Sequence, residues 1–279
     1  MIKDTGPKFN EGIIGHQLLQ LATLRANKLR ESYSLKMKPF FDHYGTEAVK
    51  HDYSEVLRKN KITRSERLKG YQSQEKQVAD VFEMLFLEAA DQESWLGNSE
   101  LTKASEYDDK FNGVDMLATL FDEEERAAHL ELSTDLTFGT VASEKKLERI
   151  LSDIENGKLA HVKYFHCDHN GYTGSLQDVP RTVIGFDRKN LPEFIRARVH
   201  ETQDVDTHRD IALYQLWVQL RMFRDYADNK LGEHRVRRNY NRTFIHIEKI
   251  VKSMGIDPNE LPDDQITENI VSMSHSINR

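Results

Sequence analysis

The chain has 279 residues, of which 38% are hydrophobic and 30% charged, and its formal net charge at pH 7 is −7. This length and composition are typical of a globular protein with a sizeable core and a hydrated surface, and no apolar run reaches the roughly 20 residues that span a bilayer. The one cysteine, Cys167, excludes an internal disulfide and leads us to expect a cytoplasmic location.

Residues from about 10 to 90 are predicted to be mostly helical. One apolar stripe is formed by Leu18, Leu19, Leu21, Leu24 and Leu29 in a segment rich in Gln, Ala, Lys and Arg. A second stripe follows steps of three and four residues between about 74 and 90: Val78, Val81, Phe82, Leu85 and Ala89. Both stripes predict amphipathic helices that pack against the rest of the protein.

Between about 110 and 187 the pattern changes to strands. Leu130, Leu132 and Leu136 alternate with polar residues, which is typical of a half-buried strand. The predicted elements follow one another as a strand over 114–121, a strand over 127–138, a capped helix from Ser143 that ends at Asn156-Gly157, a strand over 158–167 and a returning strand over 179–186.

Beyond about residue 190 the chain is again predicted to be helical. A short helix covers 191–199, and two longer ones are marked by stripes that include Trp217 and Phe244. Pro258 and Pro262 interrupt the pattern, and the tail from Asp263 is polar enough to fray. We therefore expect a helical region over 1–73, an α/β core over 74–200 and a helical extension with a flexible tail over 201–279. The C-terminal helices are a candidate surface for a homodimer.

Carboxylates on two neighbouring predicted strands are the strongest functional signal. Asp115 ends the short apolar run Gly113-Val114-Asp115, and Glu131 and Asp135 lie on one side of the next strand. At about 3.3 Å per residue these two acids are roughly 13 Å apart, so only one of them can pair with Asp115. Two carboxylates, a carbonyl and waters form a normal oxygen shell for Mg²⁺ or Mn²⁺. We favour Asp135, because Gly139 and a loop follow it, but a solvent-facing strand position explains each acid taken alone.

This order of elements and acids resembles the PD-(D/E)xK nuclease superfamily, which has the restriction-endonuclease-like fold. The resemblance covers roughly residues 74 to 187. It implies a mixed sheet flanked by helices and Mg²⁺- or Mn²⁺-dependent hydrolysis of phosphodiester bonds in DNA. Asp115 would be the first acid and Asp135 or Glu131 the second. A third metal ligand on the helix before the sheet would be Glu83, with Glu75 as a weaker match.

One departure from the family pattern concerns its lysine. Ser133 or Thr137 stands two residues after the second acid, where the family has the lysine that orients the attacking water. Lys145, Lys146 and Lys163 are candidates to replace it from elsewhere in space. Without a replacement, the resemblance implies a catalytically inactive binding module. A further alternative is a structural component whose helical ends dock on a partner protein.

DNA binding by a chain of negative net charge depends on local basic clusters, and the sequence has two. Their members are Arg58, Lys59, Lys61 and Arg64 in the first and Arg235, Arg237 and Arg238 in the second. Tyr71 and Tyr240 lie close to them in the sequence and can stack on bases. Solvated helix faces explain the same residues and are the commoner case.

A zinc site at His166-Cys167-Asp168-His169 is set aside on chemical grounds. A structural zinc site needs four ligands, and this chain has one cysteine without a second ligand pair nearby. A polar hairpin end explains the segment. Nothing around Cys167 resembles the surroundings of a cysteine nucleophile.

Overall fold

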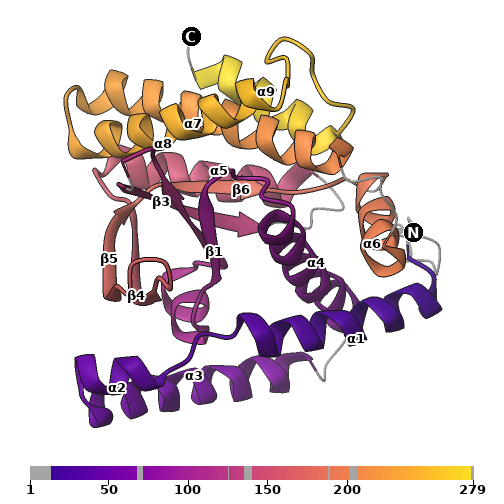
Figure 1. Ribbon diagram of the computed structural model, residues 1–279, viewed down its shortest axis with the longest axis vertical. Coiled ribbons are helices and arrows are strands. Elements are labelled where there is room, and N and C mark those ends of the chain that lie inside the picture. Colours follow the sequence, from indigo (N-terminus) through magenta and orange to yellow (C-terminus); the bar gives the residue numbers. More distant parts are fainter. Residues whose placement is uncertain are drawn as a thin grey trace, which may run out of the picture.

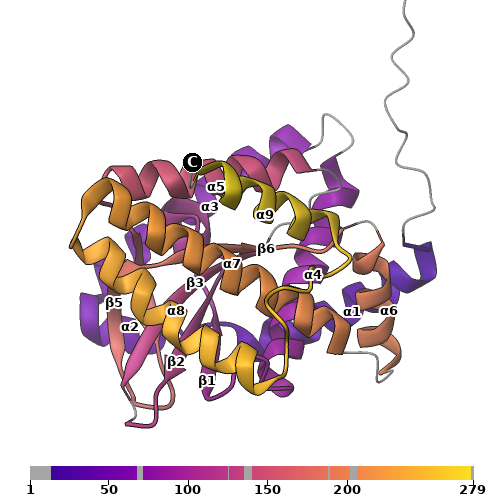
Figure 2. The same cartoon turned by 90° about the horizontal axis from the view of Figure 1, so that it is seen from above.

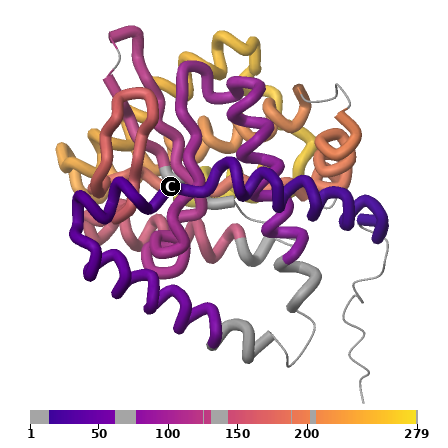
Figure 3. Tube along the Cα trace, turned by 60° about the horizontal axis from the view of Figure 1, so that its bottom comes forward, coloured from indigo at the N-terminus to yellow at the C-terminus, as the bar shows by residue number. Residues whose placement is uncertain are grey.

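The computed structural model shows a mixed α/β protein in which a four-stranded sheet and a two-stranded hairpin lie among helices (Figure 1). It describes residues 14–67, 72–124, 126–134, 140–187, 189–201 and 206–277, without the side chains of residues 62–76 and 131–142. Figures 1 and 3 show the N-terminal helices on the side of the molecule opposite to the C-terminal helices. The expected mixed α/β class is confirmed.

The N-terminal region is helical, as predicted. Its helices are α1 (His16–Tyr33), α2 (Lys38–Tyr44), α3 (Thr46–Arg67) and α4 (Gln72–Gln92). Helix α1 packs against α4 and buries Leu19, Ala22 and Ala26. Leu21 and Leu24, which the sequence placed in the apolar stripe, are 48% and 62% exposed, so that part of the prediction is wrong. The small alanines, one turn apart, form the contact face instead.

Helix α4 carries the second predicted stripe, and the structure confirms it. All five residues of the stripe are buried in the main core. Glu83 and Glu88 are the two acids in this mostly apolar segment, and Glu83 is the only residue between 81 and 90 that is not buried. An acid in this position faces partial desolvation, which costs free energy unless a partner compensates it.

The main sheet has the strand order β1-β2-β3-β6. Its strands are β1 (Ser99–Lys103), β2 (Met116–Phe121), β3 (Ala127–Thr134) and β6 (Arg181–Ile184). The first three pair antiparallel in sequence order, and β6 pairs parallel with β3. A parallel pair needs a long crossover, which here contains helix α5 (Thr140–Glu155) and a hairpin.

The hairpin is formed by β4 (Ala160–His166) and β5 (Thr173–Val179). The sequence predicted one returning strand over 179–186, and this is wrong. Strand β5 ends at Val179, Pro180 follows, and β6 begins at Arg181 in the other sheet. Proline has no N–H to donate to a ladder, so it divides the apolar run between two sheets.

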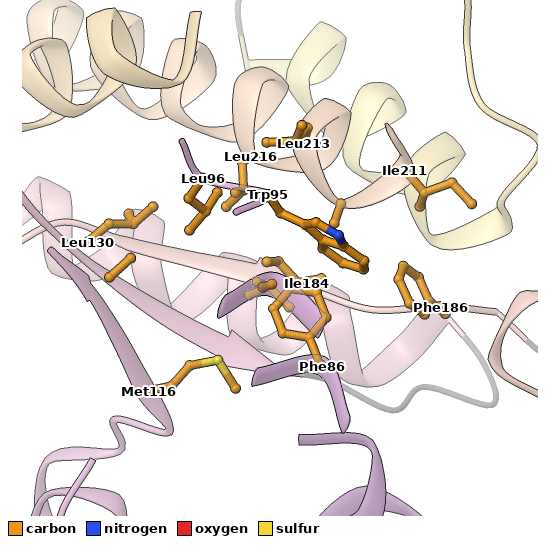
Figure 4. Packing of buried hydrophobic residues seen from close by; sticks show 14 of the residues in the cluster. Phe86, Trp95, Leu96, Met116, Leu130, Ile184, Phe186, Ile211, Leu213 and Leu216 are labelled. Carbon is orange, nitrogen blue, oxygen red and sulfur yellow. The ribbon is translucent and has the colours of Figure 1, made fainter. Parts of the chain in front are cut away.

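Strand β2 is buried on both faces, since all six of its residues are buried. Met116, Ala118 and Leu120 belong to the main core with residues of α4, α5 and α7. Leu117 and Phe121 alternate with them and belong to a second cluster with the β4–β5 hairpin. Figure 4 shows part of the main core, with Met116 and Leu130 on the sheet side and Leu213 and Leu216 on the helix side.

The C-terminal helices form a layer over the sheet (Figure 2). They are α7 (Asp206–Leu231), α8 (Arg235–Ser253) and α9 (Gln265–Ile277), preceded by α6 (Asn190–His200). No helix in the described ranges is both long and apolar enough to cross a membrane.

Helix α9 replaces the frayed tail that the sequence predicted. Ile266 and Ile270 are buried, and α9 packs against α7. The carboxylate of Asp264 accepts hydrogen bonds from the backbone N–H of Thr267 at 2.9 Å and from its hydroxyl at 3.0 Å. This N-terminal cap and the short apolar stripe account for a helix in a segment of polar composition.

Candidate functional site

A buried carboxylate shapes the segment that leads into β2. Residues Asp108–Asn112 form a single π-helical turn, and Asp108 is fully buried. Its carboxylate accepts hydrogen bonds from the hydroxyl of Ser105 at 2.6 Å and from the side-chain amide of Asn112 at 2.6 Å. It also accepts backbone N–H groups of β4, from Lys163 at 2.7 Å and Tyr164 at 3.0 Å. The turn before β2 is thus tied to the hairpin.

Gly113 and Asp115 continue from this turn into β2. Gly113 has a φ of +66°, in the left-handed region that favours glycine. A Cβ atom at Gly113 would lie 3.3 Å from Nη1 of Arg149 on α5. The carbonyl of Asp115 accepts the N–H of Ala104 at 3.1 Å, which extends the pairing of β1 and β2 by one step. The backbone of Asp115 is therefore held by the sheet.

The Asp115 carboxyl group lies in a crowded electrostatic environment. Its side chain is 18% exposed, and Nζ of Lys146 on α5 lies 3.9 Å from Oδ2. Burial, together with repulsion from Glu83 and Asp109, raises the pKa of Asp115 from its ordinary value of 3.8 to about 6, against the attraction of Lys146 and Lys103. A strongly shifted acid beside charged partners is typical of a functional site.

Glu83 reaches this group from α4 and carries a lysine partner. Its Oε2 accepts a hydrogen bond from Nζ of Lys103 at 2.9 Å, and the two side chains are 23% and 19% exposed. Burial alone would lower the pKa of Lys103, but the carboxylates of Glu83, Asp115 and Asp109 outweigh it and raise the pKa. The sequence analysis missed Lys103, whose place at the polar end of β1 was its only signal.

The structure separates the three lysines that were candidates for the missing family lysine. Lys146 lies near Asp115, whereas Lys145 beside it on α5 is exposed. Lys163 on β4 donates to the carboxylate of Asp52 on α3, and its Nζ lies 5.0 Å from the ring centroid of Tyr107. Lys163 thus belongs to a contact between α3 and the hairpin.

The two candidate second acids are described to different extents. Glu131 lies on β3, where its backbone pairs with Leu117 on one side and with Arg181 on the other. Leu117 is two residues after Asp115, so the register brings the backbone of Glu131 diagonally across from Asp115. The side chain of Glu131 and the whole of Asp135 lie outside the described part of the chain.

The basic clusters are mostly engaged within the protein. Arg58 pairs with Glu55 at 2.7 Å, and Nζ of Lys59 lies 4.6 Å from the ring centroid of Phe111. Lys61 is exposed, and the side chain of Arg64 lies outside the described part. In the second cluster, which lies on α8, Arg235 pairs with Asp178 at 2.6 Å, Arg237 pairs with Asp228 at 2.8 Å, and Arg238 is exposed.

Asp115 and Glu83 are two acids from different elements that interact electrostatically. Their repulsion contributes to the raised pKa of Asp115, and a bound cation would relieve it. Among the described residues, no group of three or more His, Cys, Asp or Glu side chains is arranged to hold a metal. The pair therefore fits part of an oxygen shell, which needs further ligands from water or from acids outside the described side chains.

Comparisons with protein-family models, with curated proteins and with solved structures find no match to this chain.

Proposed function

We propose that this chain is a divalent-metal-dependent nuclease with a restriction-endonuclease-like core. The support from the fold is the order of elements: helix α4, the antiparallel strands β1, β2 and β3, the crossover helix α5, and β6 parallel to β3. This order contains the helix, the two acid-bearing strands, the helix and the further strand that the resemblance implies, with β1 added before them and β6 instead of the strand over 158–167 as the last. The hairpin β4–β5 is then an insertion between α5 and β6.

The observation that carries the proposal is the group around Asp115. Glu83 from the preceding helix and Lys146 from the following helix converge on the acid at the start of the central strand β2. These are the residue types that metal-dependent phosphodiester hydrolysis needs, since carboxylates hold Mg²⁺ and a lysine holds a phosphate oxygen or a water. Lys163 has other partners, so Lys146 takes the place of the missing family lysine in this proposal.

Each side chain of the group has a distinct task in the proposed reaction. Asp115 and Glu83 would hold Mg²⁺ or Mn²⁺, with Glu131 or Asp135 as the further acid, and the metal would polarise the phosphodiester and activate water. Lys146 would hold the attacking water or a phosphate oxygen close to Asp115. Lys103 donates a hydrogen bond to Glu83 at 2.9 Å, so its ammonium group would compete with the metal for that carboxylate. Asp115 must be ionised to bind the metal, so activity should rise with pH through about 6.

The proposal is tested by incubating purified protein with plasmid and linear DNA in Mg²⁺ or Mn²⁺. We expect nicking or cleavage that EDTA abolishes, and a loss of at least roughly a hundredfold in Asp115→Asn and in Lys146→Met. Asp168→Asn is the matched control, because that acid is 94% exposed at the end of the hairpin. Cleavage that persists unchanged in Asp115→Asn would exclude this site.

A binding module without cleavage is the second candidate. The favouring observation is that Lys103 already donates to Glu83 while Ser133 or Thr137 stands where the family has its lysine. In that case the wild-type protein retards DNA at low salt but does not cut it in Mn²⁺. Absence of both retardation and cleavage would favour the alternative that the chain is a structural component that docks on a partner protein. A homodimer through the C-terminal helices stays a prediction.

A further inference from the structure

Arg149 lies directly beside the segment that carries Asp115. It is on α5, three residues after Lys146, and its guanidinium group lies against the backbone of Gly113. A Cβ atom at Gly113 would meet Nη1 at 3.3 Å, Nη2 at 3.5 Å and Cζ at 3.8 Å. The guanidinium of Arg149 thus lies close to the chain two residues before Asp115.

The charge of Arg149 is uncompensated within the described part of the protein. The residue is exposed, and no described acid forms an ion pair with it. Arg58, Arg235 and Arg237, which the sequence put forward as DNA-binding residues, are instead paired with acids at 2.7, 2.6 and 2.8 Å. An exposed guanidinium without an acid partner is available to an anion from solution.

We propose that Arg149 binds a phosphate of a nucleic-acid backbone and holds it next to Asp115. This inference rests on the proposed nuclease function and names the substrate contact of that site. A guanidinium presents two parallel N–H donors that match two phosphate oxygens. Arg149 and Lys146 are one turn apart on α5, and they lie next to Gly113 and Asp115, respectively. The contact is to the sugar–phosphate chain, so it is independent of base sequence.

The test measures equilibrium binding of a short fluorescein-labelled DNA duplex in EDTA over a series of potassium chloride concentrations. Arg149→Gln is expected to bind roughly tenfold more weakly at low salt. The slope of log affinity against log salt should fall in magnitude by about 0.9, the value for one lost phosphate contact. Arg149→Lys should keep most of the slope, because it keeps the charge.

Arg196→Gln is the matched control. Arg196 is also an exposed helical arginine, on α6, and the substitution changes the net charge by the same amount. Its affinity and slope should equal those of the wild type. Thermal unfolding of each variant establishes that the substitutions leave the fold intact.

The outcomes separate this contact from the nuclease proposal. Binding that depends on Arg149 without cleavage in Mg²⁺ or Mn²⁺ supports the contact and overturns the nuclease. If the wild type cleaves DNA and Arg149→Gln binds DNA as tightly as the wild type, the nuclease proposal stands and the Arg149 contact is overturned. Equal losses in Arg149→Gln and Arg196→Gln, or no binding by the wild type, also overturn it.

Discussion

Buried polar groups are treated differently at two places in the molecule, the C-terminal layer and the start of β2. In the layer, Gln219 of α7 accepts the N–H of Val183 at 2.8 Å and donates to its carbonyl at 2.7 Å. Gln215, one turn earlier, forms the same pair of bonds with Gly185, at 3.1 and 2.9 Å. Neutral amides thus complete the hydrogen bonds along the outer edge of β6.

At the start of β2 the buried polar groups are charged. Asp115, Glu83 and Asp109 repel one another, and Lys103 and Lys146 compensate them in part. The first arrangement stabilises the fold, since the two glutamine amides satisfy the N–H and carbonyl groups of Val183 and Gly185. The second keeps an acid at a raised pKa, which lowers the stability of the folded state above that pKa. Retention of such a group is understandable where the charge serves binding or chemistry.

The largest effect on stability is expected when the amide pairing of β6 is broken. Gln219→Leu leaves the N–H and the carbonyl of Val183 buried without their partner. Each such group costs about 1 to 3 kcal/mol, so the free energy of unfolding should fall by roughly 2 to 6 kcal/mol. Urea denaturation followed by circular dichroism measures this change.

Gln17→Leu, on the exposed surface of α1, is the control for the change of residue type. It should alter the free energy of unfolding by no more than about 0.5 kcal/mol. If Gln219→Leu behaves like this control, the amide pairing does not stabilise the sheet edge, and the contrast between the two places disappears.

The charged group around Asp115 should make the free energy of unfolding depend on pH. The folded-state pKa of Asp115, about 6, lies above its ordinary value of 3.8. The folded state therefore binds this proton more tightly than the unfolded state. The resulting stabilisation is fully present below about 3.8 and is lost as the pH rises through about 6. It amounts to roughly 2 to 3 kcal/mol at about 1.4 kcal/mol per pKa unit.

Asp115→Asn removes this titration and keeps the size of the side chain. The difference in the free energy of unfolding between wild type and variant, measured in urea from pH 4 to 8, should grow in favour of the variant as the pH rises. A difference that does not change over this range would show that Asp115 titrates normally and that the site is not strained by charge.

The elements that periodicity predicts correctly are those with one strongly apolar face. The stripe of α4 and the apolar face of α5 each follow from local sequence, and strand β3 lies within the predicted range 127–138. The break at Pro180 is less visible, because Val179 at the end of β5 and the residues of β6 form one predicted run, and their pairing partners lie in different sheets. Helix α9 depends on its contact with α7 and on the cap at Asp264, which composition alone does not reveal.

The residues of the candidate site could be predicted only where an acidic residue stands out within its own helix or strand, or where the family resemblance implies one. Asp115 was predicted because it ends an apolar run, and Glu83 because the family resemblance implies an acid on the helix before the sheet. Lys103 was missed, since its pairing with Glu83 joins two elements 20 residues apart. Lys163 looked equivalent to Lys146 in sequence, but α3 supplies it with Asp52, a partner 111 residues away.

The smallest expected effect concerns Lys103 and its competition with a bound metal. If Mg²⁺ or Mn²⁺ binds to Asp115 and Glu83, the ammonium group of Lys103 competes with the metal for Glu83. Lys103→Met should then bind Mn²⁺ roughly tenfold more tightly in calorimetric titration, because one nearby positive charge is removed. Lys158→Met, an exposed lysine after α5, is the control and should leave the affinity unchanged. A weaker affinity in Lys103→Met would mean that Lys103 holds Glu83 in the geometry that the metal needs, and that the charges at this place cooperate instead of competing.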